Sequence, residues 1–284
     1  TREALWEAFL ARRVYAVTGD RIGLSFSCNG RPMGSILASD GPRRFEVAVQ
    51  GWDALDRIEL LRDGRVVACH HHQVARGAAP SPARERFLLR IEAGWGPRSG
   101  ELPADDRAWE GELAAPGGRF VDWSPCWIER GQARPELLGE RARFRMRSTQ
   151  RFVEEGFQGG HVFAIEGTPE TPLVLTLNGR TETLTIAEAM RSSRVLWWRD
   201  DILDAVHRWT GLEEKDFPRE DGLFNLSWKV KLHRAVPSSA FSAAWSLEDD
   251  EPLRGETCYR VRVEQRNGQR AWSSPVWVRP TQPA

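Results

Sequence analysis

The sequence predicts a mainly β protein, an antiparallel β-sandwich with an N-terminal helix and strand and a short helical insertion. From Ile22 onward, apolar and polar residues alternate with a period of two in many short runs, which is typical of half-buried strands. Dipeptides that favour tight hairpin turns recur between these runs. They are Asn29-Gly30, Asp63-Gly64, Gly117-Gly118, Asn178-Gly179 and Asn267-Gly268.

The first expected element is an amphipathic helix over residues 1–13, with Thr1 as its N-cap. Its apolar face is formed by Leu5, Trp6, Phe9 and Leu10. A short β-like run follows over residues 14–17, and Thr18-Gly19-Asp20 ends it. These elements precede the region in which the period of two begins.

A β-rich region is expected over residues 22–280. Residues 75–86 are rich in Ala, Pro and Gly and predict an exposed loop. A helical excursion near residues 185–212 begins at a capping-box match of Thr185 with Glu188. We interpret this excursion as an insertion between strands and not as a second domain.

Composition and charge exclude several classes of protein. The 284 residues include 40 Lys and Arg against 40 Asp and Glu, so the formal net charge is zero. A neutral chain without a dense basic patch argues against a nucleic-acid partner. No run reaches about 18 apolar residues, so no membrane span is expected. The four cysteines have no CxxC spacing, which argues against a zinc knuckle. Their even number allows two disulfides, but nothing in the sequence selects a pairing, so buried free thiols are favoured.

Two histidine motifs are candidate sites. On a strand, His70 and His72 point to the same face, about 7 Å apart, and chelate a metal only if a third ligand converges. Gly159-Gly160-His161 precedes an apolar strand, where the glycines let a backbone approach a ligand or simply form a bend. For both motifs we favour the structural interpretation.

Acidic pairs and tryptophans are the remaining candidates. Asp105-Asp106, Asp200-Asp201 and Asp249-Asp250 lack metal-loop spacing and are interpreted as solvated loops. The thirteen Trp residues suit either a sugar-stacking face or a sandwich core, and we favour the core. No nucleophile elbow, phosphate-binding loop or dinucleotide fingerprint is present, so catalytic residues are not assigned.

Both ends of the chain resemble a known family. The N-terminal motifs are residues 1–9, Arg12-Arg-Val-Tyr-Ala-Val-Thr-Gly-Asp-Arg-Ile22 and Asn29-Gly-Arg-Pro-Met-Gly34, and the C-terminal motif spans residues 259–278. They resemble domain-of-unknown-function family 3604, a bacterial group similar to PHP-type (polymerase and histidinol phosphatase) metal-dependent hydrolases with a C-terminal β-rich region.

The resemblance implies that residues 1–21 are the last helix and strand of an incomplete PHP-like barrel, followed by a β-sandwich over residues 22–280. The chain, which starts with Thr1 and not Met, is then expected to be a fragment. The metal-binding segments would lie in an upstream catalytic barrel of the same polypeptide. The intact protein is then expected to use a divalent metal as cofactor. No metal is expected in this fragment, and the fragment alone is expected to be inactive.

The implied reaction of the intact protein is metal-assisted hydrolysis of a phosphate or sulfate ester. Tyr15, Thr18 and Arg21 are the substrate-proximal candidates, because α/β barrels place functional side chains at and just beyond the ends of their strands. Arg21 would pair with an anionic ester oxygen. The alternative is a non-catalytic module that binds carbohydrate or protein. The sequence does not indicate whether the protein lies in the periplasm or in the cytoplasm.

Overall fold

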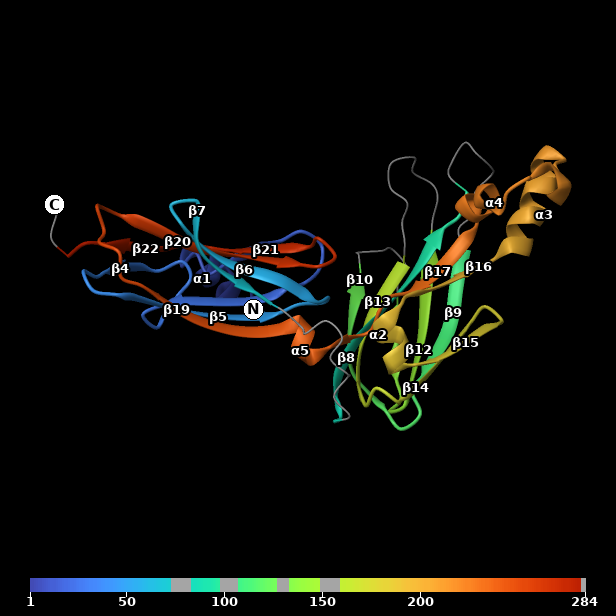
Figure 1. Ribbon diagram of the computed structural model, residues 1–284, viewed down its shortest axis with the longest axis horizontal. Coiled ribbons are helices and arrows are strands. Elements are labelled where there is room, and N and C mark those ends of the chain that lie inside the picture. Colours follow the sequence, from blue (N-terminus) through green and yellow to red (C-terminus); the bar gives the residue numbers. More distant parts are fainter. Residues whose placement is uncertain (73–82, 98–106, 127–132, 149–158, 282–284) are drawn as a thin grey trace. The chain divides into compact units, whose positions relative to one another are not determined.

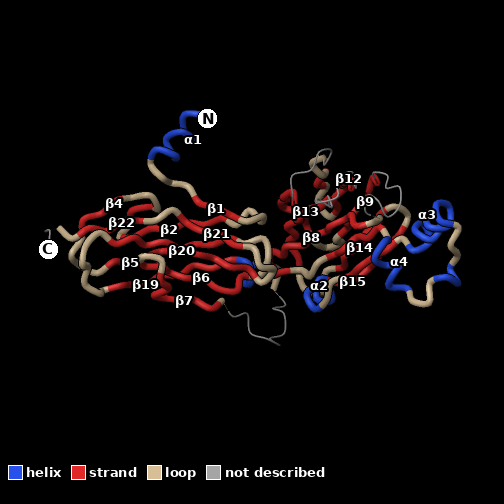
Figure 2. The backbone as a smooth tube through the Cα atoms, turned by 90° about the horizontal axis from the view of Figure 1, so that it is seen from above, coloured by secondary structure: helices blue, strands red, loops and turns tan. Residues whose placement is uncertain are grey.

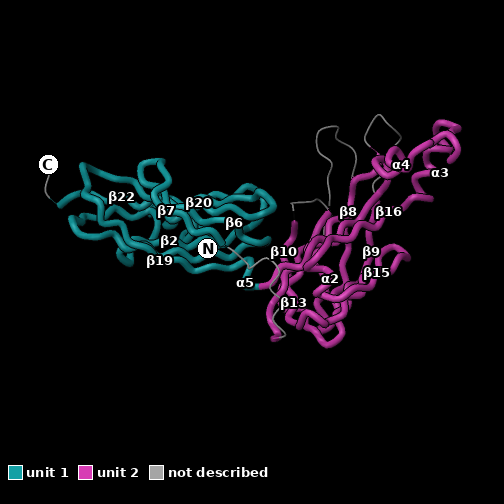
Figure 3. The backbone as a smooth tube through the Cα atoms, viewed as in Figure 1, with its two compact units in different colours: residues 1–78, 238–284 teal, residues 79–237 magenta. Residues whose placement is uncertain are grey.

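The computed structural model describes residues 1–72, 83–97, 107–126, 133–148 and 159–281 (Figure 1). The chain is mainly β, as predicted, with several antiparallel sheets and few helices. It divides into two compact units (Figure 3). Unit 1 comprises Thr1–Ala78 and Ser238–Ala284, and unit 2 comprises Ala79–Pro237.

This division differs from the single β-rich region expected over residues 22–280. Unit 2 is a continuous segment that interrupts unit 1, and it contains two sheets of its own. Local patterns reveal strands and turns, but they do not reveal which strands pair across a long insertion. The helical excursion near residues 185–212 is present and lies inside unit 2.

Unit 1 is built from two sheets. The seven strands of the larger sheet are β1 (Tyr15–Val17), β4 (Ile36–Ala38), β6 (Leu55–Arg62), β7 (Arg65–His71), β20 (Thr257–Gln265), β21 (Arg270–Ser273) and β22 (Val276–Arg279). The four strands of the smaller sheet, in order, are β19 (Ser242–Asp249), β5 (Arg43–Gln50), β2 (Gly23–Cys28) and β3 (Arg31–Pro32). The strand pairings of both sheets are antiparallel except for that of β22 with β4 in the larger sheet.

The core of unit 1 lies between these sheets, as expected for a sandwich. Side chains alternate between buried and exposed along all of β5, and the buried set joins that of β20. Members of the shared cluster include Phe26, Phe45, Val47, Ile58, Tyr259 and Val261. The alternation predicted from the sequence therefore reflects a strand with one face on a core.

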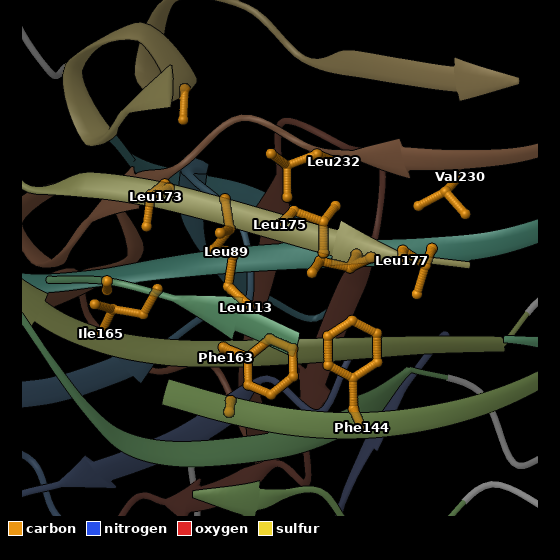
Figure 4. Close-up of a cluster of buried hydrophobic side chains, with 14 of the residues drawn as sticks. Leu89, Leu113, Phe144, Phe163, Ile165, Leu173, Leu175, Leu177, Val230 and Leu232 are labelled. Carbon is orange, nitrogen blue, oxygen red and sulfur yellow. The ribbon is translucent and has the colours of Figure 1, made fainter. Parts of the chain in front are cut away.

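Unit 2 has two further sheets. One runs β10 (Arg119–Cys126), β13 (Gly159–Gly167), β8 (Glu85–Trp95), β17 (Trp228–Leu232) and β16 (Arg194–Trp197), with β18 (Val236–Pro237) also on β8. The other runs β11 (Glu136–Leu137), β12 (Arg141–Ser148), β9 (Arg107–Ala114), β14 (Pro172–Leu177) and β15 (Arg180–Thr185). Their inner faces share one apolar core, part of which Figure 4 shows around Leu89, Phe144 and Leu175.

Two helix ends show the local signals that the sequence predicts. The helices are α1 (Arg2–Leu10), α2 (Ile186–Arg191), α3 (Arg199–Thr210), α4 (Glu220–Leu226), α5 (Ser238–Phe241) and the 3-10 turn η1 (Glu214–Asp216). Thr185 and Glu188 form the predicted capping box of α2, and Gly211, with φ of 74°, ends α3 as expected. None of the helices in the described ranges has the length and apolarity to cross a bilayer.

The predicted turns are also present, in two forms. Both residues have positive φ at Asn29-Gly30, Asp63-Gly64 and Asn178-Gly179, as a type I′ turn requires. At Gly117-Gly118 and Asn267-Gly268 the backbone has one positive φ, so those hairpins use another turn. The four cysteines are free thiols, as favoured, and Cys28 and Cys126 are buried, whereas Cys69 is exposed and Cys258 is half-buried.

Candidate functional site

The three residues expected near the site lie around β1. Tyr15 pairs through its backbone with Ser273 of β21, and its side chain is exposed. Arg21 is also exposed. The strand that was expected from residues 14–17 is thus an edge strand of the larger sheet of unit 1.

Thr18 is held by the hairpin that joins β20 to β21. Its hydroxyl donates to Gln269 Oε1 at 2.5 Å and accepts from the backbone N–H of Arg270 at 2.9 Å. The neighbouring Asp20 is buried and accepts from Gln265 Nε2 at 2.7 Å. The hydroxyl of Thr18 therefore holds the segment after β1 against the hairpin between β20 and β21.

The paired histidines lie on one face of the end of β7, as predicted. The ring centroids of His70 and His72 are 5.9 Å apart. His70 stacks on Trp245, and His72 Nε2 lies 2.8 Å from the carbonyl oxygen of Ser239. Burial, followed by the neighbouring imidazoles, lowers the pKa of His70.

The donor sets do not fit a metal ion. Within the described ranges, no three His, Cys, Asp or Glu side chains converge as ligands. Trp245, which stacks on His70, offers no lone pair to a metal. We therefore assign no hydrolytic step to the described residues.

His161 is a buried, neutral side chain. Trp123 Nε1 donates to its Nδ1 at 2.6 Å, so the ring proton is on Nε2, which faces the carbonyl oxygen of Arg145 at 3.3 Å. Burial lowers the pKa of His161 to about 4. Gly160 is needed for packing, because a Cβ there would lie 2.9 Å from Cys126 Cβ.

His161 is expected to make unit 2 sensitive to acid. The imidazole of the unfolded chain takes up a proton as the pH falls below 6.5, whereas the folded one stays neutral down to about pH 4. The stability present above pH 6.5 is lost in this window, by about 3 kcal/mol. Urea unfolding of the wild type and His161→Phe at pH 7 and pH 4 measures it. Equal losses in both proteins would contradict the assignment.

The acidic pairs behave differently from one another. Asp249 was expected in a solvated loop, but it ends β19 with a half-buried carboxylate that pairs with Arg43 at 3.1 Å. The error arose because the partner is about two hundred residues away in the sequence. Asp201 lies in the first turn of α3 and binds Arg107 at 2.6 Å. Asp105-Asp106 lies outside the described residues.

Two tryptophans in the described ranges pack in a core, as favoured from the sequence, and most of the others are half-buried. Trp109 and Trp198 are buried and meet edge to face, with centroids 4.9 Å apart. The guanidinium of Arg107 lies over both rings. Among the described residues, the strongly exposed indoles are Trp6 on α1 and Trp209 on α3, which belong to different units.

The cavity that stands out chemically lies in unit 2, beside β17. It measures about 570 Å³. The described side chains and backbone that line it are Trp95, Gly96, Val195, Phe224, Asn225, Leu226, Lys229 and Lys231. We call it the lysine pocket, because two of the three lysines of the chain line it.

Lys229 is the most unusual group of the lysine pocket. It is 7% exposed, and its amine donates to the carbonyl oxygens of Ser227 at 3.1 Å and Asn225 at 3.3 Å. The amine also lies 4.6 Å from the centroid of the Phe224 ring. Burial lowers the pKa of Lys229 to about 8.

Sequence reasoning missed this pocket. The available signal was the spacing of Lys229 and Lys231, which places both on one face of a strand, together with the scarcity of lysine elsewhere. The cavity wall comes from α4 and β16, whose packing no local pattern reveals.

Comparisons with known proteins leave the family open. No family model matches the chain, and no solved structure matches it. An uncharacterized protein of Chlamydia pneumoniae is 41% identical over 73 residues. The match covers 24% of this chain and 12% of that relative.

Proposed function

We propose that the chain is the accessory C-terminal β-rich region of a PHP-like metal-dependent hydrolase. In the intact protein an upstream barrel would hold the divalent metal and hydrolyse a phosphate or sulfate ester. The observation that carries the proposal is the uncovered apolar face of α1, together with the resemblance of that helix to the last barrel helix.

The apolar side chains of α1 are exposed. Within the described residues, no residue of α1 is buried, and Leu5, Trp6, Phe9 and Leu10 are 56–64% exposed. Figure 2 shows the helix standing away from the strands of unit 1. A contiguous apolar surface of this kind usually marks a place where another protein part is seated.

The connection below α1 is nevertheless fixed to unit 1. Arg12 Nε donates to the Gly34 carbonyl oxygen at 3.0 Å, and its guanidinium lies 5.6 Å from the Trp277 ring centroid. A Cβ at Gly34 would lie 2.4 Å from the carbonyl oxygen of Ala11, so glycine permits this approach. Because the segment after α1 is held on unit 1 and the apolar face of α1 is uncovered, the helix is suited to docking on a second domain, here the proposed barrel.

Tyr15, Thr18 and Arg21 remain the residues that we propose to lie near the substrate. They follow α1 directly, and the exposed side chains of Tyr15 and Arg21 leave them accessible to a barrel seated on that helix. Arg21 would contact an anionic ester oxygen.

Charges placed on the apolar face of α1 are expected to leave this chain folded. Trp6→Glu with Phe9→Glu should change the free energy of unfolding by no more than about 0.5 kcal/mol, because these side chains are not buried here. Binding of an apolar fluorescent dye should fall. The matched control is Ala4→Glu, outside the apolar face of the same helix, which should leave dye binding unchanged. A large loss of stability would show that the face is covered in solution.

The function itself is tested with the longer polypeptide. The DNA upstream of Thr1 is sequenced, and the complete reading frame is expressed and assayed with 4-nitrophenyl phosphate and 4-nitrophenyl sulfate, with and without added Mn²⁺ or Zn²⁺. Metal-dependent release of nitrophenol that falls with the Trp6→Glu/Phe9→Glu pair supports the proposal. An upstream frame without clustered His and Asp codons, or a complete protein without metal-dependent activity, overturns it.

A further inference from the structure

We propose that the lysine pocket binds a small organic anion, with its acid group on the amines of Lys229 and Lys231 and its apolar body against Phe224 and Leu226. The inference is independent of the hydrolase assignment, because every residue of the pocket belongs to unit 2.

The two amines share one face of the sheet. Side chains alternate along β17, and Val230 and Leu232 face the apolar core, so Lys229 and Lys231 project from the opposite face. Lys229 lies opposite Gly94 on β8 and opposite Trp197 on β16. Gly94 contributes no side chain beside Lys229.

The amines have no acidic partner among the described residues. No ion pair within 4.0 Å joins either of them to a carboxylate in the described ranges. Glu92, which lies opposite Lys231, instead contacts His233 Nε2 at 2.7 Å and Arg90 at 3.7 Å. The charged groups on this face of β8 and β17 therefore leave an excess of positive charge near the cavity.

A buried ammonium without a counter-ion is unfavourable. Lys229 compensates part of this cost through two carbonyl oxygens at the C-terminal end of α4. A helix-capping role explains these two bonds. It does not explain why the side chain is 7% exposed beside a second lysine and a cavity. A bound anion supplies the missing negative charge.

The third lysine and a cavity of unit 1 lack this feature. Lys215 forms an ion pair with Glu213 at 2.6 Å and is largely exposed. A cavity of about 610 Å³ in unit 1 is lined by Arg62 and Glu251, which pair with each other at 2.7 Å. In the described part of the chain, the lysine pocket combines unpaired cations with apolar walls.

The size and lining of the pocket define the ligand class. A volume of about 570 Å³ lies in the range of small-molecule sites. Phe224 and Val195 are partly exposed apolar side chains of its wall. A carboxylate on a short aromatic or aliphatic body matches these surfaces, because the acid meets the amines while the body covers the apolar wall.

The test measures binding of 3-phenylpropionate to the full chain by calorimetry at pH 7, beside its neutral amide and 3-phenylpropylamine. We expect the carboxylate to bind at least about tenfold more tightly than the other two, since each charge-assisted hydrogen bond supplies at least that factor. Equal binding of the three compounds, or no binding of the carboxylate, overturns the proposal.

Variants separate the pocket from general charge effects. Lys229→Met and Lys231→Met should each weaken carboxylate binding about tenfold or more, whereas Lys215→Met should leave it unchanged. Far-UV circular dichroism checks the fold, and the partly exposed Lys231 provides a second variant if Lys229→Met is unfolded. An equal loss in Lys215→Met overturns the site.

The pH profile provides a readout that a purely structural lysine would not move. Lys229 loses its charge through pH 8, so wild-type affinity should fall about tenfold between pH 7 and pH 9. The other charged groups on this face are Glu92, Arg90 and Lys231. The fall should be absent in Lys229→Met. A fall of equal size in that variant contradicts the role of the Lys229 amine.

Discussion

Replacement of Asp249 by alanine is expected to lower the free energy of unfolding of unit 1 by about 3–5 kcal/mol. The Asp249 carboxylate accepts a hydrogen bond from the Tyr259 hydroxyl and pairs with Arg43 at 3.1 Å. Arg43 is 1% exposed, so the substitution leaves a guanidinium buried without its counter-ion. Urea unfolding at neutral pH, followed by circular dichroism, measures the loss.

The chain provides a matched control and a rescue for this result. Asp250, the next residue, is exposed, and Asp250→Ala should change the stability by no more than about 0.5 kcal/mol. Arg43→Met combined with Asp249→Leu should recover most of the loss, because a buried ion pair can often be replaced by apolar side chains. Equal effects of the two alanine variants would show that the ion pair contributes little.

Trp109→Ala is expected to lower the free energy of unfolding of unit 2 by about 3–5 kcal/mol. The Trp109 ring is fully buried between the sheets of unit 2, and its Nε1 donates to Ser148 Oγ at 3.0 Å. The Arg107 guanidinium lies 4.9 Å from its ring centroid. The substitution removes the ring, leaves a cavity and deprives the cation of one aromatic face. Guanidinium unfolding followed at 222 nm measures the change.

Trp209→Ala is the comparison for that variant. Trp209 is 57% exposed on α3, so its removal should change stability by no more than about 0.5 kcal/mol. The contrast distinguishes the core interpretation of the tryptophans from a sugar-stacking surface. If Trp109→Ala costs no more than Trp209→Ala, the Trp109 ring does not stabilise the core.

The sequence predicts those parts of the fold that depend on neighbouring residues. Thr185 with Glu188 predicts a helix start, and Gly211 predicts a helix end, because caps form within one turn. The alternation along β5 predicts a strand with one buried face. The first helix was expected over residues 1–13 and spans Arg2–Leu10.

The parts that escape sequence reasoning depend on distant partners. Asp249 pairs with the buried Arg43, and the lysine pocket is lined by α4 and β16 beside β17. Nothing within a few residues of Asp249 or Lys229 indicates these contacts. The division into two units was not predicted for the same reason, because β19 pairs with β5 across the whole of unit 2.

This interrupted connectivity has a consequence for synthesis. Both sheets of unit 1 need strands from the end of the chain: β19 completes one, and β20 to β22 complete the other. During translation, the N-terminal strands of unit 1 are therefore synthesised before their partners and keep unpaired edges. Unit 2 follows as one continuous segment that can fold first. Translation that stops after Pro237 would release a finished unit 2 attached to an aggregation-prone half-sandwich.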